Sequence, residues 1–216
     1  MGLSLNLKHF CLLLKHLVNE IVVASGSLGT MANPKHLAKI KQGVKVWNKW
    51  REEHPDALPD LSGTHLSETE LKGAALWGAN LERVDLVGSN LETANLGEAN
   101  LQKAFLADTN LKWAILVRSN LEGAVLWGAD LERADLMRAN LKSAYVAEAN
   151  LRRANLLEAN LEKADFREAN LTKVVNLSVR KLARVKTLHK ARLDPELMER
   201  ISNDYPHLLR SPGEEK

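Results

Sequence analysis

The sequence LETANLGEANLQKAFLADTNLKWAILVRSN, residues 91–120, carries an apolar residue at every fifth position. The period runs unbroken from Leu61 to Leu171 and covers twenty-three positions, of which twenty-one are Leu and the others are Val146 and Phe166. Two residues before each of these positions lies a small residue, usually Ala, and the residue between them is usually Asn or Asp. A period this short and regular is typical of a repeat protein whose units stack on one another.

The five-residue unit has the pattern of one side of a coil. Side chains alternate between the two faces of an extended segment, so the apolar and the small residue face one way and the Asn or Asp between them faces the other. The two remaining positions carry glycines such as Gly123 and Gly128, which tolerate the positive φ of a tight corner. A unit this short cannot bury its own Leu, so successive coils must stack. The sequence therefore predicts an all-β solenoid of short parallel strands.

The outward positions favour a coil of twenty residues with four sides. At this spacing one column contains Asp60, Asn80, Asn100, Asn120, Asn140 and Asn160, and the opposite column contains Glu70, Asn90, Asn110, Asp130, Asn150 and Asn170. A fifteen-residue coil would interleave Asn110, Val125 and Asn140, whereas a ten-residue alternation would produce part of the same sorting. With four sides the repeats make nearly six coils, and at about 4.8 Å per coil the shaft is about 28 Å tall.

The repeat resembles that of the pentapeptide-repeat family, whose unit is Ala, Asp or Asn, Leu and two variable residues. Here it reads Ala-Asn-Leu-Glu-Arg at 79–83 and Ala-Asp-Leu-Met-Arg at 134–138. The resemblance implies a right-handed, four-sided parallel β-helix. The run from Asn33 to Arg51 and the tail from Lys186 to Leu209, with its LDPEL and YPHLL motifs, are similar to the ends of pentapeptide-repeat proteins common in cyanobacteria.

We expect four segments along the chain. They are an amphipathic extension over 1–30, an N-terminal helical cap over 31–58, the β-helix over 59–175, and a C-terminal helical cap and tail over 176–216. Repeat arrays need such caps because an open terminal coil would expose its core.

Helix signals support both expected caps. Asn33 as a capping residue and Pro34 in the first turn predict a helix over 34–51, although its lysines also fit a basic amphipathic helix that binds an acidic surface. At the other end we predict helices over 178–184 and 195–203, the second with Asp194 as its cap.

The segment 1–30 combines apolar residues with a polar stripe at helical spacing. It is too polar to span a membrane, and the stripe interrupts any signal-peptide core. Peripheral membrane contact or export stays an alternative, as does the view that the family's natural start is Met31 and that 1–30 is an upstream extension. The single cysteine, Cys11, excludes an internal disulfide and fits a reducing compartment such as the cytoplasm.

Motifs for catalysis are missing from this sequence. The seven histidines lack metal-ligand spacing, and the glycines belong to repeat corners rather than to a phosphate-binding loop. We therefore expect no enzyme activity, cofactor, metal or small-molecule substrate. The net charge is +3, and residues 61–175 contain thirteen basic and sixteen acidic residues, a difference of −3, so the charge does not favour nucleic acid.

An apolar stripe interrupts one outward column. It consists of Phe105, Val125 and Tyr145, with Val87 and Trp127 beside it. Because monomers seldom expose large apolar patches, the stripe suggests a contact surface. A protein partner, a second copy and the protein's own chain remain equally open as its cover.

A second column, on a corner, contains Trp113, Arg133, Arg153 and Lys173. Stacked cations beside an aromatic ring could follow a phosphate backbone. The alternative, which the mixture of charges favours, is that the nearby Glu132, Glu148 and Glu168 neutralise the column.

Taken together, the sequence favours a non-catalytic protein-interaction or scaffold module. The family resemblance offers an alternative, because some pentapeptide-repeat proteins mimic duplex DNA and inhibit DNA gyrase. That mimicry requires a long acidic rod, and the near-neutral shaft argues against it. A peripheral membrane-associated regulator is the third alternative, and it depends on residues 1–30.

Overall fold

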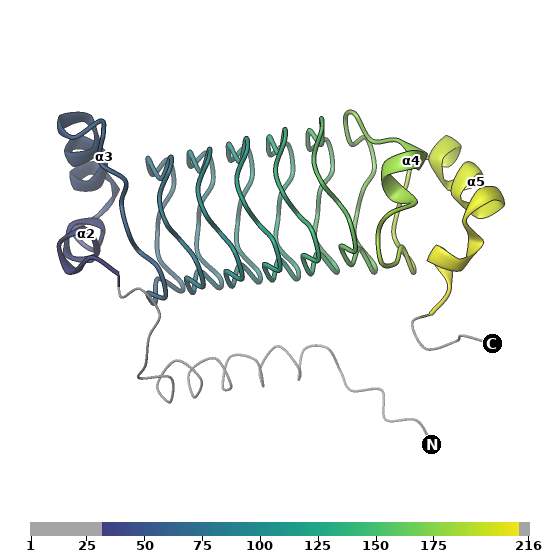
Figure 1. The fold of residues 1–216 in the computed structure, drawn as a ribbon, viewed down its shortest axis with the longest axis horizontal. Coiled ribbons are helices and arrows are strands. Elements are labelled where there is room, and N and C mark those ends of the chain that lie inside the picture. The colour runs from purple at the N-terminus through teal and green to yellow at the C-terminus, as the bar shows by residue number, and fades with distance from the viewer. Residues whose placement is uncertain (1–31, 212–216) are drawn as a thin grey trace, which may run out of the picture. The chain divides into compact units, whose positions relative to one another are not determined.

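The computed structural model describes residues 32–211, and in them the chain winds into stacked coils with helices at both ends (Figure 1). Parallel bridges join outward residues twenty positions apart, from Asp60 with Asn80 to Asn155 with Val175. This spacing confirms the twenty-residue coil with four sides. The predictions made for 1–30, including membrane contact, lie outside the described residues.

Backbone hydrogen bonds show how each five-residue unit holds to its neighbours. The Leu121 amide donates to the Asn140 carbonyl at 2.8 Å, and the Asn120 amide donates to Ala99 at 2.9 Å. At the corner the Ala124 amide donates to the Leu121 carbonyl, and Gly123 has a φ of +66°. Many other repeats place a non-glycine residue at this corner in the same left-handed region, at about 1 to 2 kcal/mol each. The ladder between coils must therefore outweigh the strain of the corners.

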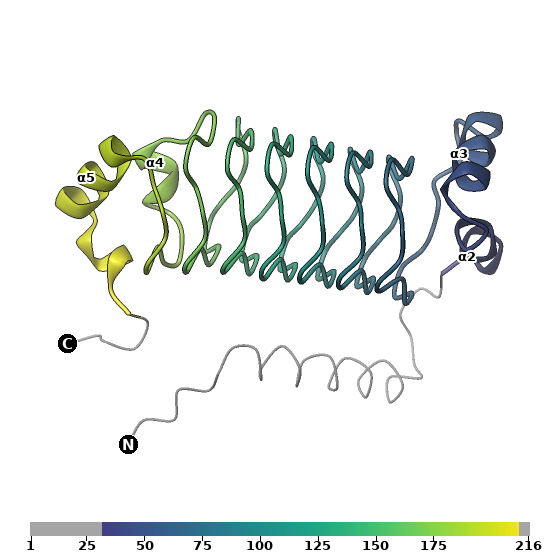
Figure 2. The same ribbon diagram turned by 180° about the vertical axis from the view of Figure 1, so that it is seen from behind.

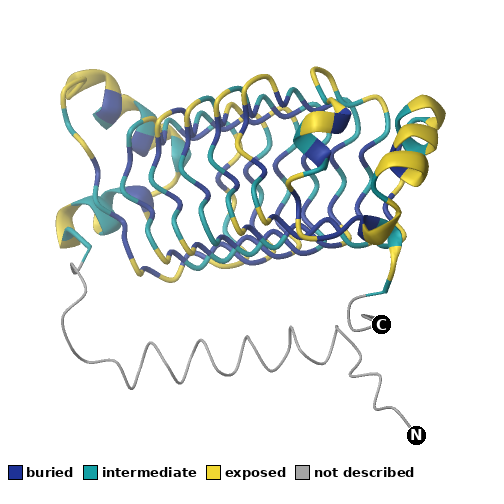
Figure 3. Cartoon of the chain, turned by 45° about the vertical axis from the view of Figure 1, so that its right-hand side comes forward, coloured by how far each residue is buried: buried dark blue, intermediate teal, exposed yellow. Residues whose placement is uncertain are grey.

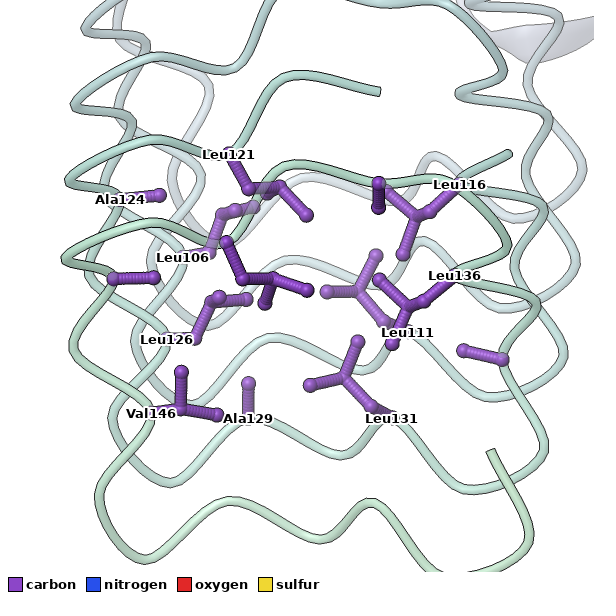
Figure 4. Packing of buried hydrophobic residues seen from close by; sticks show 14 of the residues in the cluster. Leu106, Leu111, Leu116, Leu121, Ala124, Leu126, Ala129, Leu131, Leu136 and Val146 are labelled. Atoms are coloured by element: carbon purple, nitrogen blue, oxygen red, sulfur yellow. The ribbon is translucent and has the colours of Figure 1, made fainter. Parts of the chain in front are cut away.

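The interior of the shaft is a stack of leucines and alanines. Figure 4 shows them converging from the four sides, and Leu121, Ala124 and Leu126 expose none of their surface. Val146 and Phe166, which replace Leu in the period, are equally buried. Exposed residues gather at the corners and on the terminal helices (Figure 3).

Asparagine ladders reinforce the outward columns. The Asn100 amide group donates to the Asn80 side-chain oxygen at 3.2 Å, and that oxygen also accepts from the backbone amide of Glu82. The same arrangement links Asn110 with Asn90. Each Asn thus joins its own corner to the next coil, which explains why the repeat keeps Asn or Asp facing outward.

Two helices precede the first coil: α2 spans Pro34–Ile40 and α3 spans Val44–Glu53. The prediction of one helix over 34–51 is therefore wrong, because Gly43 adopts a φ of +100° and ends the helical path between the two segments. The prediction that Asn33 caps the start of this helix is confirmed, since its side chain accepts a hydrogen bond from the Lys35 amide at 2.9 Å.

Helix α3 supplies the hydrogen bonds that a preceding coil would otherwise make. In later coils the amide equivalent to that of Ala75 donates to the coil before it, as Asn95 does to Ala74. Here Asn48 takes that role, because its oxygen accepts from the Ala75 amide at 2.9 Å. The indole of the fully buried Trp47 donates to the Ala75 carbonyl, also at 2.9 Å. The first coil therefore has no unpaired edge at these groups.

The ladder continues past residue 175, where the sequence placed the end of the repeats. Thr187 pairs with Asp165, and Arg192 pairs with Asn170, each at a spacing of twenty-two residues. Helix α4, Val179–Leu182, lies in the longer connection before these two pairs. Leu188 and Leu193 keep the five-residue spacing and are buried, but the connection with α4 adds two residues, so they fall out of register with Leu61 to Leu171 and the sequence pattern ends early.

After the last bridge, α5 spans Pro195–Asp204 and the 3-10 helix η1 spans Pro206–Leu209. Ile201 and Leu208 are buried in the same hydrophobic cluster as the shaft. Asp194 precedes α5 as predicted, but its carboxylate accepts from the Lys173 amide instead of from its own helix. The view from behind shows α2 and α3 at one end of the coils and α4 and α5 at the other (Figure 2). Among the described residues no helix has the length and apolar character needed to cross a membrane.

Candidate protein-interaction surfaces

The predicted stripe is in register, because bridges link Phe105, Val125 and Tyr145 on three successive coils. All three side chains are partly exposed. Val87 and Trp127, which flank the stripe, are buried, each with 8% of its surface exposed. The indole of Trp127 donates to Glu148 at 3.1 Å.

Charged groups bracket the C-terminal end of this stripe. The Arg167 guanidinium donates to the Tyr145 hydroxyl at 2.8 Å and lies 5.3 Å from the centre of its ring. Arg167 also binds the buried carboxylate of Asp165 at 2.8 Å, and this hydrogen bond raises the pKa of the guanidinium above its ordinary value. Tyr145 is therefore held in a polar network as well as in an apolar column.

Backbone hydrogen bonds place the basic column on successive coils, and its neutralisation by nearby glutamates stays a prediction. The Arg133 guanidinium lies 4.4 Å from the Trp113 ring centre, a cation–π contact. The three glutamates that were expected to neutralise the column have other partners. Glu132 pairs with Arg152 at 2.8 Å, Glu148 accepts from Trp127, and Glu168 lies 3.8 Å from Lys190. Within residues 32–211, Arg133, Arg153 and Lys173 form no ion pair of their own.

A more exposed apolar surface lies on the side of the shaft opposite the stripe. We call it the Ile115 face, and it comprises Trp77, Ile115, Val117, Met137 and Leu157. The exposed fractions are 42% for Trp77, 44% for Ile115 and 37% for Leu157. Trp113, at 52%, borders this face from the basic column. Exposed rings and aliphatic side chains on successive coils are typical of a binding surface.

The packing of Trp77 explains how this face stays continuous. The first coil of the shaft carries Trp77 at this corner, and the equivalent residue of the next coil is Gly97. A β-carbon at Gly97 would lie 3.2 Å from the Trp77 ring, so the indole occupies the space that a larger residue would need. Two coils later Val117 takes over, followed by Met137 and Leu157.

Sequence reasoning missed the Ile115 face because it followed the outward Asn/Asp columns and their breaks. The signal was present in the corner positions, where residues 77, 97, 117, 137 and 157 are all apolar or Gly. Reading those positions at twenty-residue spacing would have identified the surface.

No group of three or more His, Cys, Asp and Glu side chains could hold a metal ion in the part of the chain that the structure describes. Many charged side chains pair across coils, as Arg138 does with Glu158 at 2.7 Å, a contact that raises the pKa of the arginine and lowers that of the glutamate. Such pairs tie neighbouring coils together along the surface of the shaft.

Three solved structures show what this chain is similar to. HetL, a pentapeptide repeat protein involved in heterocyst differentiation regulation from the cyanobacterium Nostoc sp. strain PCC 7120, is 30% identical, with a TM-score of 0.48, and the match covers 67% of this chain. This chain spans 62% of the length of HetL. The pentapeptide repeat protein Rfr23 from the cyanobacterium Cyanothece 51142 is 28% identical over 55% of this chain and 93% of its own, with a TM-score of 0.42. QnrB1, a plasmid-mediated fluoroquinolone resistance protein, is 20% identical over 63% of this chain and 72% of its own, with a TM-score of 0.38.

Curated proteins give no significant match to this chain. The family model for pentapeptide repeats, in contrast, matches eight copies over residues 60–97, 94–133, 114–147 and 147–174. These ranges together cover more than half of the sequence and coincide with the coils described above. On this match, the chain belongs to the pentapeptide-repeat family.

Proposed function

We propose that this protein is a non-catalytic interaction module, a rigid four-sided shaft that presents the Ile115 face to a protein partner. The observation that carries the proposal is the exposure of Trp77, Ile115 and Leu157 on one side of a backbone whose coils are fixed by hydrogen bonds. Because the backbone is already ordered, a partner would bind without the entropic cost of folding a flexible segment.

In this proposal the terminal helices act as caps. Asn48 and Trp47 satisfy backbone groups of the first coil, and Ile201 and Leu208 cover apolar surface beyond the last bridges. Closed ends prevent the coils from stacking with those of another copy. The sides of the shaft are then the surfaces left for recognition.

The sequence-predicted stripe of Phe105, Val125 and Tyr145 stays a prediction for a second contact surface. Its side chains are less available than those of the Ile115 face, since the flanking Trp127 is almost fully buried. We therefore place the Ile115 face first and test the stripe separately.

Mimicry of duplex DNA is not favoured. Glu98 pairs with Arg118, and Glu92 pairs with Lys72, so acidic and basic side chains alternate between coils. A DNA mimic needs an unbroken row of negative charge. Purified protein should therefore leave gyrase supercoiling unchanged, and inhibition at a stoichiometric ratio would favour the mimic.

The proposed function is tested by replacing Met137 and Leu157 with Gln, the residue that already stands at the equivalent corner position 102. The variant should fold like the parent, because neither side chain lies in the buried stack. It should lose proteins that the parent recovers from native extract. Recovery of the same proteins by both would refute the Ile115 face as the contact surface.

A further inference from the structure

Three cations border the Ile115 face along one edge. Arg133, Arg153 and Lys173 are equivalent residues of successive coils, so their Cα atoms are stacked about 4.8 Å apart. The apolar side chains of Met137 and Leu157 run parallel to them on the other edge of the same side. The surface therefore has a positive edge and an apolar edge.

The two edges differ in how their charges are used. On the apolar edge, the neighbouring Arg118 and Arg138 each pair with a glutamate, at 3.3 and 2.7 Å. On the positive edge, the three side-chain cations form no ion pair with any described residue, and Arg133 lies over the Trp113 ring. The carboxylate of Asp194 accepts from the backbone amide of Lys173 at the end of this edge. Of the two edges, the positive edge is therefore the one whose cations are free to pair with an acidic partner.

The carboxylate in the middle of this side does not cancel the edge. Asp135 accepts hydrogen bonds from the Met137 amide at 3.1 Å and from the Asn155 side chain at 2.9 Å. It is the outward Asp of the repeat and serves the ladder between coils. Its presence in the centre also disfavours a nucleic acid, whose phosphates would have to pass over it.

The dimensions of this side match an α-helix. From the coil of Trp77 to the coil of Lys173 the two edges span five coil spacings, about 24 Å, which equals about sixteen residues of helix. The coil spacing of about 4.8 Å is close to the helical pitch of about 5.4 Å, so side chains one turn apart can meet successive coils. Each side of the shaft presents five residues from one corner to the next, and a helix with its side chains is about 10 to 12 Å wide.

We propose that the Ile115 face binds an amphipathic α-helix of a partner protein whose apolar side covers Met137 and Leu157 and whose acidic flank pairs with Arg133, Arg153 and Lys173. The proposal rests on the proposed function and names its partner's chemistry. Apolar burial supplies affinity, and the cations fix the direction in which the helix lies.

The probe is a fluorescein-labelled, capped 18-residue helical peptide with Leu along one side and Glu along one flank. Two matched peptides replace every Glu with Lys or every Leu with Gln. Fluorescence anisotropy should show binding of the Glu peptide to the full chain, with weaker binding at higher salt, and markedly weaker binding of both matched peptides.

One triple variant and one double control distinguish pairing with the three cations of the positive edge from a general effect of positive charge on binding. The charge variant replaces the three cations Arg133, Arg153 and Lys173 with Gln, and the control replaces Arg118 and Arg138 with Gln. All five residues occupy the same corner position with φ between 57° and 61°, so the backbone demand is matched. Because three surface pairs are lost, the charge variant should bind the Glu peptide about tenfold more weakly. The control should change binding less than twofold.

Three outcomes would overturn the acidic-helix proposal. One is equal binding of the Glu and Lys peptides, and another is equal loss in the charge variant and its control. The third is tighter binding of a labelled 20-nucleotide DNA that depends on the same cations, which would assign the edge to nucleic acid. If the peptide fails while native partners still depend on Met137 and Leu157, the proposed function survives and the acidic helix does not.

Discussion

Replacement of Asn48 by Ala tests whether helix α3 completes the first coil. The Asn48 side chain donates to the Gly73 carbonyl and accepts from the Ala75 amide, each at 2.9 Å. Two lost hydrogen bonds at about 0.5 to 1.5 kcal/mol each amount to about 1 to 3 kcal/mol. Ala gains about 0.5 kcal/mol of helix propensity over Asn, so the net loss should be about 0.5 to 2.5 kcal/mol.

Amide hydrogen exchange of residue 75 is the most direct assay. Repeat proteins can open at a terminal unit while the rest stays folded. Local opening of the first coil would therefore lower the exchange protection of the Ala75 amide even when the shaft as a whole unfolds at an unchanged urea concentration. Lys49→Ala is the matched control, since it lies on the same helix and removes only an exposed pair with Glu53. Protection of Ala75 that is equal in the Asn48 variant and the control would refute the reasoning.

Three further predictions concern the core, the stripe and pH. Leu121→Asp should abolish cooperative thermal unfolding, because an unpaired carboxylate has no partner in the Leu stack, and an unchanged midpoint would mean that the register is wrong. If the stripe binds a second copy or a partner, replacing Phe105 and Val125 with Asn should lower the particle mass measured by light scattering or remove the partner's band from a pull-down. A fall of several degrees in the thermal unfolding midpoint, without either change, would indicate that the protein's own chain covers the stripe. Burial lowers the pKa of His36, whose Nδ1 accepts a hydrogen bond from the Asp60 amide. The unfolded state therefore binds more protons than the folded state, and the free energy of unfolding should fall as the pH drops below about 6.5 toward the lowered pKa of the folded state. His36→Asn should lose this part of the pH dependence, and a variant with the same dependence as the parent would contradict the assignment.

The regular part of the fold follows from the sequence because its determinants are local. Leu at every fifth residue can be buried only by stacked coils, and the sorting of outward Asn at twenty-residue spacing gives the number of sides. The bridges from Asp60 to Val175 confirm both inferences. The terminal structures were harder to predict. Apolar residues at helical spacing continue across Gly43, so the period alone could not show that the backbone leaves the helix there.

The ion pairs on the surface follow the coil register, in which residues twenty positions apart are neighbours, so they can be predicted only when this register is used to choose the partners. Glu132 was expected, with Glu148 and Glu168, to neutralise the basic column, and its direct ion pair is with Arg152, which lies one coil away at the equivalent position. The solvent exposure of the outward and corner side chains was harder to predict from the sequence. The outward break at Val125 was visible, whereas the burial of Trp127 and the openness of Met137 depend on how corner side chains pack.

Quantitative affinity capture from native extract tests the central claim most directly. The parent chain, the Met137→Gln/Leu157→Gln variant and the Arg118→Gln/Arg138→Gln control would be immobilised at equal density, after their unfolding midpoints have been shown to agree. The interaction-module account predicts proteins that the parent and the control recover equally and the Met137/Leu157 variant loses. Recovery of the same proteins, in the same amounts, by all three would contradict it.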